Sequence, residues 1–549
     1  MLCDQSHRQS PLSVSPSRTL SQPFTTALID TGSPARQCFV VYTILIAAML
    51  SPLIWAPIPP LVDYPNHLAR MWILVHSKEI PELALNYDIH WRILPDLAMD
   101  LVVTTLSRVI PVEEAGRLFI AMTMLALVGG TLTLYRVLHG RLEIWPICSV
   151  LFIYNAALFW GFVNCLFATG LYLFAFSGWI ATRDWRGGPR ILTFSAVASF
   201  LLLLHLFAFG LYGLSVVAYE LAAGTNVQRM SPRRLVEWGV ACLQFLPGII
   251  LWYASLAHSG STSTSYGDFV AKLYALISPF TFAHQPVALD RIIGLLISLF
   301  LMLSILSRAL KLVPEMRFVL AAMIVAAVLM PNRMSGSWNA DIRLPVALPF
   351  VAIASSRLEA SRKSMIGLFA VAGLIALGLR VWAVSQSWCD YNRWYTEFRA
   401  ASAAIMPGKR LLVVAAPTLG QELKLPGVPA ALAKPQWVTF SHMGALAVID
   451  RAVFFPYLFT GWTTIDVTPR NELVSEREAL PISPEVLASS TTLESTPDVA
   501  SEKRYWQNWP ETFDFVLWMD SSGARKPEFK QLRLLNSGSF FDIYRVVRP

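Results

Sequence analysis

The sequence predicts a mainly helical membrane protein, a polytopic bundle with a small C-terminal α/β domain. Hydrophobic residues make up 55% of its 549 residues and charged residues only 15%, whereas soluble chains carry about 25% charged residues. Long apolar segments alternate with short loops that contain Arg and Lys. After about residue 385 the apolar runs shorten and turn residues become frequent, which is typical of a soluble segment.

The N-terminal end is expected to combine a tail and a first span. Residues 1–36 are rich in Ser, Pro and Thr and show no hydrophobic period, so they predict a disordered tail. The apolar run Cys38–Ile58 is about 20 residues long and suits a membrane span. It lacks a clear small-residue cleavage site, which argues against a removed signal peptide.

The basic residues predict the number and orientation of the spans, because cytoplasmic loops carry an excess of Arg and Lys. Five short loops with grouped basic residues should lie in the cytoplasm: 136–141, 183–190, 229–234, 308–317 and 357–363. For the sides to alternate, residues 190–223 must form two spans with a turn near His205, and Asp96–Ile110 must be an interfacial helix. This predicts about 11 spans over residues 37–385, a cytoplasmic N-terminus and an outer loop with surface helices at 62–117.

The first outer loop contains the first candidate site. A helix that begins near Tyr64 places Asp63, Asn66, His67 and Arg70 on one face, at spacings of three and four residues. Such a helix would lie on the membrane, and its polar face combines a base, an orienting partner and an anion clamp. Alternatively, Asp63 is only the N-cap of this helix, with Pro65 in the first turn.

A second cluster precedes a short Pro-containing span and includes Trp338, Asp341 and Arg343. Ionisable groups near a membrane surface are costly unless they are paired or functional. Arg343 could hold a phosphate, and Asp341 could orient it or bind substrate. Alternatively, Trp and Arg here only mark the membrane boundary. His205, in the predicted turn between two spans, is a further candidate for the site.

Residues 386–549 are expected to form an extracytoplasmic α/β domain. Strand patterns occur at Leu411–Ala416, Asp514–Met519 and Ser539–Val547, with a helical pattern at Ala445–Leu458. The domain contains neither a phosphate-binding glycine loop nor a Gly-x-Ser-x-Gly elbow. We therefore expect it to cover or shape the membrane site.

Cysteine spacing and the distribution of basic residues argue against a zinc site and against nucleic acid as a partner. The six cysteines show no metal-type spacing, so no zinc site is predicted. The basic residues are scattered between apolar runs, which argues against nucleic acid as a partner.

This layout resembles the glycosyltransferase C superfamily, and among its bacterial members it is similar to lipid A aminoarabinose and protein mannosyl transferases. The resemblance is carried by Leu61-Val62-Asp63-Tyr64, by Asp341-Ile342-Arg343-Leu344-Pro345 and by the outer C-terminal domain. It implies transfer of a sugar, with inversion, from a polyprenyl-phosphate donor to a lipid, glycan or protein acceptor at the outer face of the inner membrane.

The resemblance also implies roles for individual residues. Asp63 becomes the general base, and Arg70 or Arg343 binds the lipid phosphate. An acidic pair often stands in this loop of the family, whereas here Tyr64 follows Asp63. This departure puts a requirement for a divalent metal in doubt, because hard cations prefer more than one carboxylate; a divalent metal stays a possible cofactor.

Two other classes of protein fit the same composition. A polytopic transporter or lipid flippase would also contain many spans, and a non-catalytic envelope assembly protein could carry the same outer domain. Transporters are often built from internal repeats, and no duplicated motif is visible here. Convergence of Asp63, Arg70 and Arg343 on one outward-facing site would favour the transferase.

Overall fold

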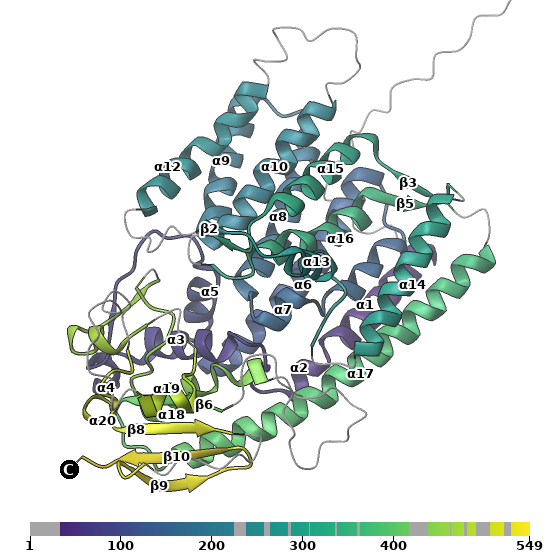
Figure 1. Ribbon diagram of the computed structural model, residues 1–549. Helices are drawn as coiled ribbons and strands as arrows, with labels where there is room; N and C mark the ends of the chain where they lie inside the picture. The colour runs from purple at the N-terminus through teal and green to yellow at the C-terminus, as the bar shows by residue number, and fades with distance from the viewer. Residues whose placement is uncertain are drawn as a thin grey trace, which may run out of the picture.

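The computed structural model describes residues 33–223, 238–256, 264–283, 287–306, 308–334, 337–359, 363–416, 437–461, 463–476, 480–489, 505–520 and 529–548. Of the predicted tail, only residues 33–36 fall in these ranges, and they open the first helix. A helical bundle fills the upper part of Figure 1, and a mixed sheet with short helices lies at its lower end.

The bundle contains most of the helical residues. Its helices are α1 (Ser33–Leu50), α2 (Pro52–Trp55), α6 (Val112–His139), α7 (Ala156–Trp160), α8 (Val163–Ala181), α9 (Gly187–Leu204), α10 (Leu206–Ala223), α12 (Leu246–Ser255), α13 (Phe269–Ile277), α14 (Val287–Leu306), α15 (Pro314–Leu329), α16 (Arg343–Ser355) and α17 (Lys363–Ser402). Two short antiparallel pairs join its loops: β2 (Thr264–Ser265) with β4 (Arg333–Met334), and β3 (Leu310–Leu312) with β5 (Ser356–Leu358).

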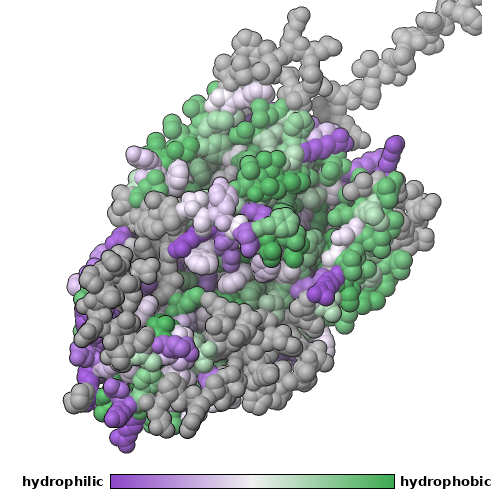
Figure 2. Space-filling view, in the orientation of Figure 1, coloured by the Kyte–Doolittle hydropathy of each residue, from purple (hydrophilic) through white to green (hydrophobic). Residues whose placement is uncertain are grey.

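The described part of the chain contains six helices long and apolar enough to cross a membrane, and two shorter apolar helices. The six are Arg36–Trp55, Val112–His139, Val163–Ala181, Gly187–Leu204, Trp238–Ser255 and Gly367–Ser402. Hydrophobic residues gather over the surface of the bundle, as Figure 2 shows in green. The chain is therefore a multi-pass membrane protein, while the number of about 11 spans stays a prediction.

Small residues let the two central helices α6 and α8 approach closely. A Cβ atom on Gly130 would lie 2.7 Å from the carbonyl oxygen of Gly170, and one on Gly170 would lie 2.6 Å from Ala126. Contacts between small residues replace the hydrophobic driving force that helices lack inside a membrane. Helices α3 (Tyr64–His76) and α5 (Ala98–Leu106) of the first outer loop pack against this pair.

Two features of the predicted topology are present. A break at His205 separates α9 from α10, where the turn between two spans was expected. The segment Asp96–Ile110 contains α5 (Ala98–Leu106), which at nine residues is too short to span a membrane.

The first outer loop contains α3 (Tyr64–His76), α4 (Pro81–Ala84), β1 (Tyr87–Ile89) and α5. Helix α3 begins where the sequence predicts, but its polar face does not lie on a membrane surface. Asn66, His67 and Arg70 are all buried, because α5 and the C-terminal domain pack against this helix. Polar partners from those elements replace the solvent that an interfacial helix would contact.

The C-terminal domain is built on a four-stranded sheet of order β6-β8-β10-β9. Strands β6 (Leu411–Ala415), β8 (Phe515–Met519) and β10 (Phe541–Val546) match the three predicted strands, whereas β9 (Leu532–Ser537) was not predicted. β6 and β8 are parallel, and the other pairs are antiparallel. The predicted helix Ala445–Leu458 is only the short α18 (Leu446–Arg451). The described part of the domain also contains β7 (Ile465–Val467), α19 (Pro484–Ser489), α20 (Trp509–Thr512) and short 3-10 helices.

Strand pairing and ion pairs are among the contacts that join the C-terminal domain to the first outer loop. β1 pairs with β7 antiparallel, with Asp88 opposite Asp466. Arg399, near the end of α17, forms ion pairs with Glu113 of α6 and Asp450 of α18. The predicted domain boundary at 385–386 falls inside α17, so one continuous helix links the bundle to the sheet.

Candidate functional site

Asp63 directly precedes α3, and its carboxylate does not cap that helix. Its backbone N–H donates to the carbonyl of Trp160 at 3.1 Å, and the N–H of Val62 donates to Phe159 at 2.9 Å. These bonds hold the Asp63 loop against the end of α7. The structure therefore does not support capping as the role of this side chain, which is left available for other contacts.

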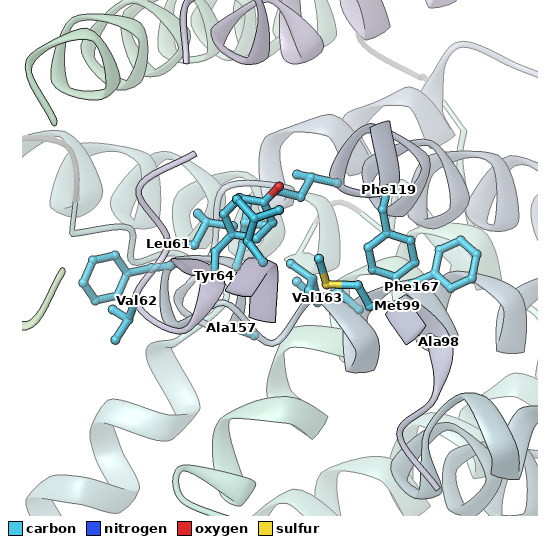
Figure 3. Close-up of a cluster of buried hydrophobic side chains, with 14 of the residues drawn as sticks. Leu61, Val62, Tyr64, Ala98, Met99, Phe119, Ala157, Val163 and Phe167 are labelled. Atoms are coloured by element: carbon cyan, nitrogen blue, oxygen red, sulfur yellow. The ribbon is translucent and has the colours of Figure 1, made fainter. Parts of the chain in front are cut away.

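Apolar side chains surround the Asp63 loop. Figure 3 shows this cluster, in which residues before and at the start of α3 meet residues of α5, α6, α7 and α8: Leu61, Val62, Tyr64, Ala98, Met99, Phe119, Ala157, Val163 and Phe167. Such surroundings disfavour a charged carboxylate. Burial accordingly raises the pKa of Asp63 to about 7, although Arg343 opposes the shift, while the negative charge of Asp96 adds to it.

His442 of the C-terminal domain faces Asp63, with its Nε2 at 3.5 Å from Oδ1. Its Nδ1 lies 3.0 Å from the amide nitrogen of Asn66. The orientation of this amide is defined by the backbone, since Oδ1 of Asn66 accepts from the N–H of Phe459 and Nδ2 donates to the carbonyl of Tyr457. Asn66 therefore donates to Nδ1, which leaves the proton of a neutral His442 on Nε2, toward Asp63.

A second carboxylate, Asp96, stands opposite His205. The two side chains are 3.8 Å apart at Oδ1 and Nε2, and the N–H of Phe207 donates to Nδ1 of His205 at 3.1 Å. The side chain of Asn164 holds the segment from Asp96 to Met99. Its amide nitrogen donates to the Asp96 carbonyl, and its amide oxygen accepts from the N–H of Met99.

Asp96 has an unusual backbone and electrostatic environment. Its φ of 83° is a left-handed conformation that side chains rarely adopt, and strained residues of this kind are often functional. The pKa of Asp96 is raised through desolvation by the surrounding protein, against the lowering effects of Arg70, Asn164 and Arg343; the shift is smaller than full burial would cause, because the side chain is 53% exposed.

The positive charge of Arg343 acts on both carboxylates, because it lowers the pKa of Asp63 and that of Asp96. One Nη atom donates to the hydroxyl of Ser337 at 2.6 Å, and the guanidinium lies 4.7 Å from the centre of the Phe162 ring. Its buried Nε has no hydrogen-bond partner among the described residues. Arg343 therefore retains donor capacity for an anion.

Arg70, by contrast, is committed to a buried ion pair. Its Nη2 donates to both oxygens of Asp100, at 2.9 and 3.2 Å, and Thr464 also donates to that carboxylate. His67 lies beside it, with Nδ1 at 3.5 Å from Nη1. Burial lowers the pKa of His67 to about 3, and the charges of Arg70 and His442 add to the effect. Both residues support α3 from within the protein.

The remaining predicted site residues lie apart from this cluster. Asp341 is fully buried and binds Lys272 at 3.3 Å and Asn332 at 3.1 Å. It stabilises the loop before α16 and does not pair with Arg343 in the described contacts. Trp338 is 57% exposed, with the guanidinium of Arg333 over its ring, which agrees with a role at the surface.

Four residues of this arrangement were not among the predicted site residues: Asp96, Gly161, Asn164 and His442. Gly161 has a φ of 86°, and a Cβ atom there would lie 2.9 Å from the Asp63 nitrogen. The run Trp160-Gly161-Phe162-Val163-Asn164, between two apolar helices, was the available signal. Among the described residues no group of three or more His, Cys, Asp or Glu side chains could hold a metal ion.

No model of a known protein family matches the chain, and no curated protein matches it. Solved structures similar to it include ArnT from Cupriavidus metallidurans bound to undecaprenyl phosphate, at 11% identity and a TM-score of 0.48, and ArnT from the same organism in the apo state, at 12% identity and a TM-score of 0.45. Each alignment covers 93% of this chain and 98% of the other.

Proposed function

We propose that this protein is a membrane glycosyltransferase that moves a sugar from a polyprenyl-phosphate donor to an acceptor hydroxyl, with Asp63 as general base. The single observation that carries the proposal is the Asp63 carboxylate, which caps no helix and faces both a neutral imidazole and the charge of Arg343. Its pKa of about 7 suits a general base, because proton transfer is most efficient when that value lies near the working pH.

In the proposed reaction the acceptor oxygen attacks the anomeric carbon while its proton passes to Asp63. The bond from that carbon to the phosphate oxygen breaks, and the lipid phosphate leaves with the electron pair. Attack on the face opposite the phosphate inverts the anomeric configuration. Arg343 is assigned to the phosphate, because a guanidinium binds it through paired donors and stabilises the charge that develops on the leaving group.

The other predicted residues have supporting roles in this proposal. Asn66 orients His442, and the pair of Arg70 with Asp100 supports the helix that begins after Asp63. Asp96 and His205 face each other within the reach of the Arg343 charge, so we assign them to the sugar or the acceptor.

A direct assay tests the function. The purified protein is incubated with a radiolabelled sugar on undecaprenyl phosphate and a membrane lipid extract as acceptor, and the label is followed from donor to product. A transferase moves the label and releases undecaprenyl phosphate. A transporter or flippase, reconstituted in vesicles, would move the intact donor across the bilayer and release no lipid phosphate.

Gly161→Ala is expected to abolish transfer, because the new Cβ would push the Asp63 backbone away from α7. Gly140→Ala is the matched control, since Gly140 also has a left-handed φ, of 72°, but no atom within 4 Å of its Cβ position. Both variants should lose about 1–2 kcal/mol of stability for the left-handed backbone, and Gly161→Ala should lose more because its Cβ meets backbone atoms. Stability is measured by thermal unfolding in detergent. Equal activity in the two variants would contradict the role of Gly161.

The proposed orientation places the N-terminus in the cytoplasm and the C-terminal domain outside the inner membrane, as the basic loops predict. Cys389 is exposed on α17, and a variant with this cysteine alone should react with a membrane-impermeant maleimide on intact cells. A variant with Cys3 alone should react only after the cells are opened. Protection of Cys389 in intact cells would refute this orientation.

A further inference from the structure

His442 is the point at which the C-terminal domain contacts the Asp63 carboxylate. It lies between two short 3-10 turns, Trp437–Phe440 and Met443–Ala445, and is only 5% exposed. The rings of Tyr457 and Phe459 pack around it, with centres 5.8 and 5.2 Å away. The imidazole is thus held on several sides by its own domain.

Both nitrogens of this ring have defined partners. Nδ1 accepts from Asn66, so the proton of the neutral ring is on Nε2, and among the described residues this nitrogen faces Asp63. Burial lowers the pKa of His442 to about 4, so the ring is neutral at physiological pH. His442 therefore directs the N–H of Nε2 toward Asp63, with 3.5 Å between Nε2 and Oδ1, while its Nδ1 is already occupied as an acceptor.

We infer that His442 is a positioning residue, through which the C-terminal domain orients the Asp63 carboxylate and stabilises its ionised form. The inference rests on the proposed function of Asp63 but concerns a different domain, for which the sequence predicted only a covering role. A donor aimed at a carboxylate favours the charged form, and that is the form a general base must have before each turnover.

Two charged groups act on Asp63 from separate elements. Arg343 at the start of α16 favours the carboxylate, whereas Asp96, before α5, and burial among apolar side chains oppose it. His442 is neutral at physiological pH, so in this inference it acts on the Asp63 carboxylate through the N–H of Nε2 and not through a charge.

The test compares two substitutions that keep the size of the side chain. His442→Phe keeps a ring and removes the donor, while Asn66 retains the Tyr457 carbonyl as a partner. His442→Gln places an amide N–H near the former Nε2. The pKa of Asp63 should rise by about one unit in the Phe variant and stay close to the parent value in the Gln variant.

Two readouts separate this inference from the proposed function. The first is infrared titration of the protonated carboxyl band of Asp63, assigned by its absence from Asp63→Asn, which does not depend on any substrate. The second is the pH profile of transfer, whose acid limb should move to higher pH by the same amount in His442→Phe. If the parent transfers no sugar, the proposed function fails while the infrared titration still reports on His442.

The inference is overturned if the Asp63 band titrates alike in the parent and His442→Phe, or if His442→Gln shifts it as far as Phe does. Only monodisperse protein of normal thermal stability is compared, so that general unfolding does not enter the result. If His442→Phe does not fold, His442→Met takes its place, because a flexible thioether side chain adapts to irregular spaces. It must produce the same upward shift.

Discussion

Replacing Asp63 with Asn is expected to lower sugar transfer by about 10²–10⁴-fold, because that is the usual contribution of a general base. The amide has nearly the same shape as the carboxylate but does not accept the acceptor proton. Expression and membrane insertion should stay near those of the parent. The measurement is the initial rate of label transfer at saturating donor, normalised to the amount of purified protein.

Two controls sharpen this prediction. Asp63→Ala should lose as much activity as Asp63→Asn without an added loss of stability, because the side chain makes no capping hydrogen bond; a true cap would cost about 1 kcal/mol. Asp88→Asn, in β1 of the same loop, should transfer sugar at the parent rate. An Asp63→Asn variant with parent activity would falsify the proposed mechanism.

The pH dependence of sugar transfer by the parent protein is an independent test of Asp63 as the general base. Because the pKa of Asp63 is raised to about 7, its carboxyl group is mostly protonated at pH 6 and unable to act as a base. Transfer should therefore rise as the pH increases through about 7, and this limb should be missing from the residual activity of Asp63→Asn.

Arg343→Ala is expected to weaken use of the polyprenyl donor by about 10–100-fold in kcat/KM, which corresponds to the loss of one or more hydrogen bonds to a charged group. Arg343→Lys should recover only part of this loss, because an ammonium lacks the paired donors of a guanidinium. The measurement is the dependence of the transfer rate on donor concentration, together with inhibition by added undecaprenyl phosphate.

Arg333→Ala is the matched control for this change. Arg333 belongs to the same loop, but its guanidinium lies over the exposed ring of Trp338. Its removal should leave donor use at the parent level. If Arg343→Ala also shows unchanged dependence on the donor and unchanged inhibition by undecaprenyl phosphate, Arg343 is only an anchor at the membrane boundary.

Local and compositional signals were sufficient for much of the fold. The start of α3 at Tyr64, the break at His205 and three of the four strands of the C-terminal sheet follow from periodicity, turn residues and the distribution of charge. β9 was missed because its residues are mostly exposed and lack a clear alternation. The helix near Ala445 was predicted too long because the buried segment after α18 is apolar without being helical.

Within the site, residue type identified candidate side chains, but the sequence did not reveal their ion-pair and hydrogen-bond partners. Asp63 and Arg343 were singled out as ionisable groups in an apolar context, and the Arg343 charge acts on Asp63. Arg70 satisfied the same criterion, yet Asp100, 30 residues further along the chain, holds its guanidinium in a buried pair. Helical spacing describes one face of α3 but not the elements that cover that face.

The sequence by itself determined that this protein is a multi-pass membrane protein with a C-terminal α/β domain, and that a carboxylate precedes the first helix of its first outer loop. Hydropathy, charge and short periodic patterns are local properties, so they can be read without the fold. Only the tertiary structure decided that His442, 376 residues from Asn66, faces Asp63, and that Gly161 supports the same loop. Such contacts depend on how distant segments pack, and no local pattern encodes them.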